Sequence, residues 1–400
     1  MNPVYLIDGV RTPIGKYRGG LARIRSDDLA AHVVAALVER QPTLAPRIDH
    51  VAFGSTNQAG EDNRNVARMA LLLAGLPYEV PAVTVNRLCG SGLEAINDVA
   101  RMIAVGECEV AIAGGVESMT RAPFSMPKAE EPFSRQPPPI YDTTLGWRYP
   151  NPRMKERFPL LGMGETAENV AKKYGITRQE QDEFALESQK KGVAAWEAGL
   201  FAGEIAPVTI PERKGSPTVF ARDESPRPDT TLAALAALKP AFRADGSVTA
   251  GNSSPLNDGA AAVMLASESV VKELGVTPSL RLVANATAGV DPSYMGEGPI
   301  PATRKALARA GLRAPNLDVI ELNEAFASQS IACVRSLDLD PKRVNVRGGA
   351  ISLGHPIGAS GARIVVTLMH AMKADPKARL GLASLCIGVG QGIATLFERA

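Results

Sequence analysis

The feature that most constrains this fold is a regular alternation of short apolar runs with longer amphipathic segments. Between the strand-like runs of the first third, apolar residues recur every three to four positions. These runs are VYLID (4–8), HVAFG (50–54), VPAVTV (80–85) and EVAIAGG (109–115). The alternation is typical of parallel sheets covered by helices on both faces, so the sequence predicts an α/β fold.

Two of the amphipathic segments have clear helical features. Ser26 is predicted to cap the first, with Asp27 and Asp28 in the first turn, where carboxylates interact favourably with the helix dipole. The second follows VPAVTV and places apolar side chains at helical spacing over residues 93–103.

The character of the sequence changes between residues 121 and 246. Residues 121–159 are rich in proline and lack periodicity. Thr177 and Glu180 then form a predicted capping box for a helix that runs toward Gly199. We expect residues 121–246 to be an inserted loop domain. It would interrupt an N-terminal half of residues 1–120 and 247–275, and a C-terminal half would follow at 276–400.

The strand–helix alternation resumes after the insertion with a plan similar to that of the first third. VNRLCGSGLEAI (85–96) and LGHPIGASGARI (353–364) both place a glycine-rich turn with Cys or His before an amphipathic helix. Together with the matching order of elements, this similarity predicts two similar α/β halves.

Charge and composition exclude several classes of protein. The 400 residues include 44 Lys+Arg and 42 Asp+Glu, so the net charge of +2 gives no case for a nucleic-acid partner. No apolar run reaches the length of about 18 residues that a membrane helix needs. Asp8 and Arg11 interrupt the stretch that a signal peptide keeps apolar. Four scattered cysteines are too few for a disulfide framework. We expect a cytoplasmic protein with reduced thiols and no membrane partner.

Cys89 lies between a strand-like run and a helical segment, and Gly90, Ser91 and Gly92 follow it. At a helix N-terminus, free N–H groups and the helix dipole favour the thiolate. The small residues also allow a substrate carbonyl to approach the backbone. The alternative is a buried cysteine that only fills space.

Three further polar residues lie at strand ends or glycine-rich turns. His355 is embedded in GGAISLGHPIGASGARI and either reacts or only hydrogen-bonds to its loop. Cys386 begins CIGVGQG, whose alternating glycines indicate a close backbone approach or a hairpin; alternatively, it is a core thiol. Asn323 either supplies a functional amide or is only a helix N-cap.

The sequence contains no CxxC or HExxH motif and no GxxxxGK[ST] loop, so it predicts neither a metal site nor a phosphate loop. Two thiols, an imidazole and a carboxamide remain, all at strand ends. That set suits acyl transfer through a thioester, with carbanion chemistry next to a carbonyl.

These motifs resemble those of the thiolases. The resemblance lies in NRLCGSG, NEAFA, GGAISLGHPIGASGAR and CIGVGQG, and also in VRTPIGKYRGGL, GNSSPLNDGAA and MGEGPIPATRKAL. It spans nearly the whole chain in the right order. It implies a five-layered αβαβα fold of two similar halves with an inserted loop domain, assembled as a homodimer or homotetramer.

The resemblance also implies a ping-pong reaction of small acyl-CoA substrates, with coenzyme A or acetyl-CoA as substrate and no permanently bound cofactor. Cys89 would carry the acyl group after His355 takes its proton, and Cys386 would act as acid and base at the α-carbon. Asn323 would hold a water that forms one oxyanion site with His355. The backbone N–H groups of Cys89 and Gly388 would form the other.

For coenzyme A, the resemblance maps Ser254 to the pantetheine contact, and Met163 and Phe326 to the channel around it. Arg227 either meets the nucleotide phosphates or is a solvated loop charge. Gly162 stands where many members of the family have a histidine, which leaves the packing of pantetheine open.

The implied activity is that of a short-chain acetyl-CoA acetyltransferase, which cleaves or forms 3-ketoacyl-CoA, as in β-oxidation of fatty acids. The segment YDTTLGWRYPNP (141–152) is also similar to a stretch in β-ketoadipyl-CoA thiolases of aromatic degradation. In that alternative, Arg148 would pair with a distal carboxylate. The sequence also leaves open a ketoacyl synthase, or a carrier protein that kept the fold but lost catalysis.

Overall fold

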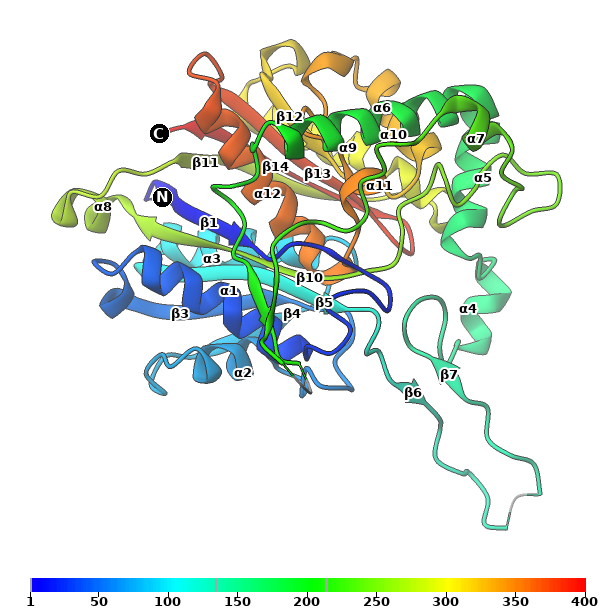
Figure 1. The fold of residues 1–400 in the computed structure, drawn as a ribbon, viewed down its shortest axis with the longest axis horizontal. Helices are drawn as coiled ribbons and strands as arrows, with labels where there is room; N and C mark the ends of the chain where they lie inside the picture. Colours follow the sequence, from blue (N-terminus) through cyan, green and yellow to red (C-terminus); the bar gives the residue numbers. More distant parts are fainter. Residues whose placement is uncertain (1, 134, 213–214) are drawn as a thin grey trace.

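A large mixed sheet organises the computed structural model, which describes residues 2–133, 135–212 and 215–400 (Figure 1). Its strands are β1 (Val4–Arg11), β2 (Gly15–Lys16), β3 (Ile48–Gly54), β4 (Ala82–Val85), β5 (Val110–Ser118), β10 (Asn257–Ser267), β11 (Leu280–Gly289), β12 (Val319–Leu322), β13 (Leu380–Ile387) and β14 (Gln391–Arg399). The order is β12-β13-β14-β11-β1-β10-β5-β3-β4, and β2 pairs with β10.

The sheet consists of two halves with the same topology. In the first, β1, β10 and β5 are successively antiparallel, and β3 and β4 continue parallel to β5. In the second, β11, β14 and β13 are antiparallel, and β12 continues parallel to β13. Val344 adds a parallel bridge beyond β12, in the place that β4 has in the first half. The predicted duplication is confirmed.

Helices occupy equivalent places in the two halves. Those of the first half are α1 (Ser26–Arg40), α2 (Val66–Leu73) and α3 (Ser91–Val105), and their counterparts are α9 (Pro299–Ala310), α10 (Ala327–Ser336) and α12 (Ile357–Ala374). The shorter elements are α8 (Glu268–Leu274), α11 (Ala350–Leu353), η1 (Ala45–Arg47), η2 (Pro292–Glu297), η3 (Ala314–Asn316) and η4 (Pro341–Arg343).

Three hydrophobic clusters define the layers. The central one joins α3 and α12 to strands of both sheet halves, whereas α1 with α2, and α9 with α10, cover the outer faces. Along β10, Val263 and Leu265 belong to the central cluster, and Ala262 and Met264 to an outer one. Successive side chains of a strand point to opposite faces, which explains why β10 is buried along its whole length. The five-layered α/β fold is confirmed.

The two central helices approach one another at backbone distance. A Cβ atom on Gly92 of α3 would lie 2.7 Å from the backbone nitrogen of Ala362 in α12. A Cβ atom on Gly361 would lie 2.2 Å from the backbone nitrogen of Leu93. Only glycine allows such an approach. The glycine-rich sequences therefore bring together the N-terminal ends of α3 and α12, which follow Cys89 and His355.

The chain between β5 and β10 forms the insertion. Its elements are β6 (Phe124–Ser125), β7 (Tyr141–Asp142), α4 (Pro152–Arg157), α5 (Met163–Tyr174), α6 (Arg178–Glu197), β8 (Val208–Ile210), β9 (Thr218–Phe220) and α7 (Leu232–Ala236). The hairpin of β6 and β7 extends away from the layers (Figure 1). The capping box of Thr177 and Glu180 is confirmed at the start of α6. The exact boundaries of the insertion at 121 and 246 stay predictions.

One predicted helix cap was wrong, and the N-cap that was left open as an alternative for Asn323 is excluded. Ser26 is the first residue of α1, and Arg25 before it is the N-cap, with no side chain bonded to the helix start. Asn323 cannot cap α10, because the helix begins at Ala327 after Phe326. The Asn323 backbone N–H instead continues the sheet by donating to the Ser384 carbonyl at 2.9 Å.

Within the described residues, no helix combines the length and the apolar character that crossing a membrane requires.

Candidate active site

Cys89 lies in a tight turn between β4 and α3, as the sequence predicted. Leu88 before it has a left-handed backbone, with φ at 46°. The turn is closed by hydrogen bonds from the Gly90 and Ser91 N–H groups to the carbonyls of Arg87 and Leu88. The Ser91 hydroxyl also donates to the Leu88 carbonyl at 2.6 Å. These contacts fix the direction of the thiol, and Cys89 stays partly exposed.

The second thiol reaches this place from the far end of the chain. Cys386 is buried near the end of β13, and Gly388 follows in the turn of the β13–β14 hairpin. The Gly388 N–H forms a hydrogen bond to the Cys89 thiolate and favours it. The pKa of Cys386 is raised well above its usual value by burial and then by the neighbouring Cys89. The structure therefore brings Cys89, Cys386 and Gly388 together.

The Cys89 thiol differs from the expectation that a helix N-terminus favours its ionised form. Burial raises its pKa to about 11, and the hydrogen bonds from the Gly388 N–H and from its own N–H oppose this only in part. The N–H groups of Gly90 and Ser91 close the turn and are not free for the sulfur. The resting group at neutral pH is therefore the thiol.

His355 precedes Pro356, the N-cap of α12, and is buried. The Asn323 amide donates to its Nε2 at 3.3 Å, and its Nδ1 lies 2.5 Å from the Ser360 hydroxyl. Ser360 donates its own proton to the Pro356 carbonyl at 2.8 Å. This assigns the ring proton to Nδ1 and leaves Nε2 as the basic atom. Burial, and then the Arg363 guanidinium, lower the pKa of His355 to about 3, so the ring is neutral.

Asn323 joins the imidazole to the second sheet half. Its side chain is completely buried, and its backbone N–H is bonded to Ser384, two residues before Cys386. Among the described residues, its Oδ1 has no hydrogen-bond partner. A buried acceptor left unpaired costs about 1–3 kcal/mol, so this oxygen is ready to accept a bond from a water or a substrate.

A hydrophobic cluster continues from Cys386 toward the insertion. Met163 and Phe326 both belong to it, and a Cβ atom on Gly388 would lie 3.4 Å from the Met163 sulfur. Gly162 is the N-cap of α5, and its N–H donates to Glu165 at 2.7 Å. Sequence reasoning thus selected residues that surround the second thiol.

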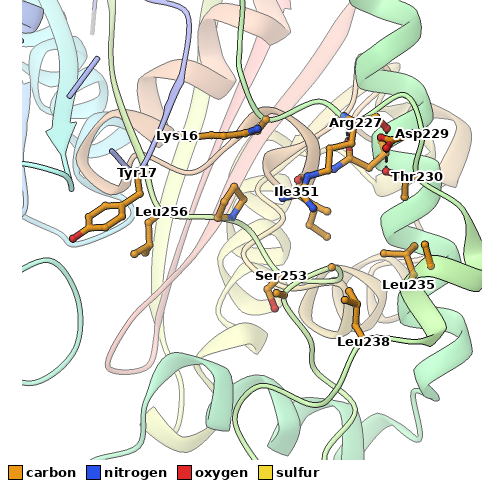
Figure 2. Close-up of a pocket in the computed structure, with 16 residues that line it drawn as sticks. Lys16, Tyr17, Arg227, Asp229, Thr230, Leu235, Leu238, Ser253, Leu256 and Ile351 are labelled. Carbon is orange, nitrogen blue, oxygen red and sulfur yellow. Dashed lines mark hydrogen bonds between the residues drawn. The ribbon is translucent and has the colours of Figure 1, made fainter. Parts of the chain in front are cut away.

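Beside this cluster lies a cavity of about 440 Å³. Figure 2 draws the residues that line it. Lys16 and Tyr17 lie on one side of it, Arg227 and Leu235 on the other, and Ser253 and Leu238 below and between them. Ser253 lines the cavity itself, whereas its neighbour Ser254 donates its backbone N–H to the Ala325 carbonyl at 3.0 Å. Sequence reasoning missed Lys16, Tyr17 and Ser253, because only the folded chain brings their three segments together.

Glu117 is a buried carboxylate that sequence reasoning also missed. It accepts hydrogen bonds from the hydroxyl of Thr56 at 2.6 Å and from the Gly358 N–H, in the first turn of α12, at 2.9 Å. Burial raises its pKa to about 6. Its charge raises the pKa of Cys89. A carboxylate that directly follows the apolar run VAIAGGV was the available signal.

No group of three or more His, Cys, Asp or Glu side chains in the described part of the chain is placed to hold a metal ion.

The high pKa of Cys89 predicts how its reactivity depends on pH. The thiolate is the reacting form, and its fraction rises tenfold per pH unit below a pKa of about 11. Alkylation of Cys89 by iodoacetamide should therefore accelerate about tenfold per unit between about pH 6 and pH 9. Timed labelling followed by peptide mass spectrometry measures the rate. A plateau inside this range would show that the thiol ionises far more easily.

Comparisons with known proteins agree with this arrangement. Residues 4–269 match the family described as "Thiolase, N-terminal domain", and residues 276–399 match "Thiolase, C-terminal domain". The chain is 56% identical over 399 residues to a Pseudomonas aeruginosa protein named beta-ketoadipyl-CoA thiolase, with 99% of each chain covered. It is 49% identical over 400 residues to another protein of that bacterium, named acetyl-CoA acetyltransferase, with 100% of each covered. A crystal structure of the Bacillus anthracis acetyl-CoA acetyltransferase has a TM-score of 0.94 at 43% identity, covering 100% of this chain and 99% of that one.

Proposed function

Because the chain belongs to the thiolase family, we propose that it is the thiolase that cleaves β-ketoadipyl-CoA into succinyl-CoA and acetyl-CoA. As a thiolase it is an acyltransferase. The observation that carries the choice of substrate is the higher identity to the relative named for β-ketoadipyl-CoA than to the one named acetyl-CoA acetyltransferase. The short-chain activity preferred in the sequence analysis has less support than its alternative.

In the proposed mechanism, the Cys89 sulfur attacks the C3 carbonyl of the substrate while His355 Nε2 takes the thiol proton. The resting pair is a thiol with a pKa of about 11 and an imidazole with a pKa of about 3, so proton transfer has to accompany the attack. The C2–C3 bond then breaks. The electron pair goes to C2, where the Cys386 thiol protonates it, and acetyl-CoA leaves.

The second half of the reaction restores the enzyme. The thiol of a free coenzyme A gives its proton to the Cys386 thiolate and attacks the acyl group on Cys89. The Cys89 sulfur leaves and recovers its proton from His355. Negative charge on the substrate oxygen would be stabilised by the Gly388 and Cys89 N–H groups, or by His355 with a water on Asn323. Losing one such donor typically costs about 3–4 kcal/mol in the transition state.

We assign the cavity of Figure 2 to coenzyme A, bound as a substrate. Arg227 and Lys16 supply positive charge for its phosphates, and Ser253 and Ser254 lie where its pantetheine arm would pass toward Met163 and Phe326. This assignment is supported by the backbone of Ser253, which lines the cavity and forms an antiparallel β-bridge to Phe326. Phe326 in turn belongs to the hydrophobic cluster of Cys386.

A homodimer or homotetramer is proposed from the exposed apolar surface. β4 ends the sheet and exposes Val83, and Leu72, Leu73 and Tyr78 are exposed on the neighbouring chain segment. Unpaired edge strands and apolar patches of this kind are typical of contacts between chains. A cytoplasmic location is proposed as well, because all four cysteines are unpaired.

The substrate is tested by comparing kcat/KM for β-ketoadipyl-CoA and acetoacetyl-CoA. We expect kcat/KM to be about tenfold higher or more for β-ketoadipyl-CoA, because a charge-assisted contact to its carboxylate is worth about 1.5–3 kcal/mol. Equal values would contradict the assignment and return the protein to the short-chain activity.

A further inference from the structure

We propose that Arg148 is the side chain that recognises the distal carboxylate of the substrate. This proposal rests on the proposed function and adds a residue that determines specificity. Arg148 lies in the insertion, between β7 and α4.

Backbone carbonyls hold the Arg148 guanidinium in place. Its Nη1 donates to the Thr143 carbonyl at 3.2 Å, and its Nη2 donates to the Thr56 carbonyl at 3.5 Å. The side chain is half-buried, and among the described residues its hydrogen bonds go to these two carbonyls, with no ion pair to a carboxylate. An oriented cation without an internal counter-charge, with donors left over from the five of a guanidinium, is prepared for an external carboxylate.

The same contacts place Arg148 beside the turn that carries the nucleophilic thiol. The Asn86 amide donates to the Thr56 carbonyl at 3.3 Å, so Asn86 and Arg148 share one acceptor. The Asn86 Oδ1 in turn accepts from the Leu88 N–H at 3.0 Å, directly before Cys89. On its other side, Thr56 donates to Glu117, whose charge acts on Cys89.

The residue before Arg148 anchors this segment to the other wall of the site. The indole N–H of Trp147 donates to the Leu161 carbonyl at 3.1 Å. Leu161 comes two residues before Met163, which lies beside Gly388. The hydrogen bonds of Arg148 and Trp147 thus connect this segment both to the Cys89 turn and to the Met163 side of the site.

The other arginine near the nucleophile already has partners. Arg87, two residues before Cys89, pairs with Glu94 at 3.1 Å and donates to Gln391 at 3.1 Å. The succinyl group that β-ketoadipyl-CoA would leave on Cys89 places its carboxylate a pair of methylene groups away from the thioester carbonyl. A carboxylate so close to the thioester needs a cation next to the Cys89 turn, and among the described residues Arg148 offers one there without an ion-pair partner.

The test compares kcat/KM for β-ketoadipyl-CoA with that for 3-oxohexanoyl-CoA, which has the same chain length without the carboxylate. In Arg148→Gln, the preference for β-ketoadipyl-CoA should fall about 10- to 100-fold, because the ion pair is lost. Arg148→Lys should recover part of the preference through its charge. The control Arg153→Gln removes an exposed arginine from the same segment and should keep the wild-type preference.

The outcomes separate this proposal from the proposed function. A wild-type protein without preference for β-ketoadipyl-CoA overturns both. A wild-type preference that Arg148→Gln leaves unchanged overturns the role of Arg148 and leaves the function standing. An equal fall for both substrates marks a structural role and also overturns the proposal. If Arg148→Gln does not fold, Arg148→Lys with the same two substrates decides, because a carboxylate receptor predicts a reduced preference and a structural residue an unchanged one.

Discussion

The substitution Cys89→Ser is expected to abolish the acyl-enzyme and to lower thiolysis by at least about 10⁴-fold. A serine hydroxyl is far harder to ionise than the thiol, and the His355 imidazole, with a pKa of about 3, is too weak a base to compensate. Intact-protein mass spectrometry after incubation with acetyl-CoA measures the effect, because the wild-type chain gains one acetyl group and the variant gains none.

Cys108→Ser is the matched control for this experiment. Cys108 is a buried thiol of the central cluster, and the same exchange of sulfur for oxygen there should leave acetylation intact. An acetyl group found on the Cys89→Ser chain would mean that another residue is the nucleophile.

The substitution Cys386→Ser should separate acylation from carbon–carbon chemistry. Acetylation of Cys89 by acetyl-CoA should persist, because coenzyme A can leave as a thiolate without the proton that the second thiol would give it. Exchange of the acetyl-CoA methyl protons with deuterated buffer should fall about 10²–10⁴-fold, the usual contribution of a positioned acid or base. The raised pKa of Cys386 keeps it protonated at rest, in the form that donates to an enolate. NMR of acetyl-CoA recovered from deuterated buffer follows the exchange, and a normal rate would contradict the assignment.

Local patterns predicted much of the fold. The capping box of Thr177 and Glu180 specifies the start of α6 through contacts within one turn. The positions of Cys89 before a helix and of Cys386 at a hairpin also follow from neighbouring residues. The glycines after each cysteine indicate a tight turn at the end of a strand. Predictions of this kind need only interactions close in sequence.

What could not be predicted depends on contacts distant in sequence. The pKa of Cys89 is raised by its burial in the folded chain, whereas the helix start alone suggested the opposite direction. Asn323 is of a residue type that often caps helices, yet its backbone N–H continues the sheet by donating to the Ser384 carbonyl. The cavity lined by Lys16, Tyr17 and Ser253 forms only when three separate segments meet.

The close contact of α3 with α12, which glycine allows, limits which substitutions the two halves can accept. Since these helices are counterparts in the two halves, Cys89 and His355 occupy equivalent positions, each two residues before the start of its helix. In the proposed mechanism each half supplies one of these two residues, so neither repeat would form the centre alone, and a shift of either helix by one residue would disturb both. Such a constraint directs variation to the insertion, where new substrate preferences can arise while the symmetric interior stays unchanged.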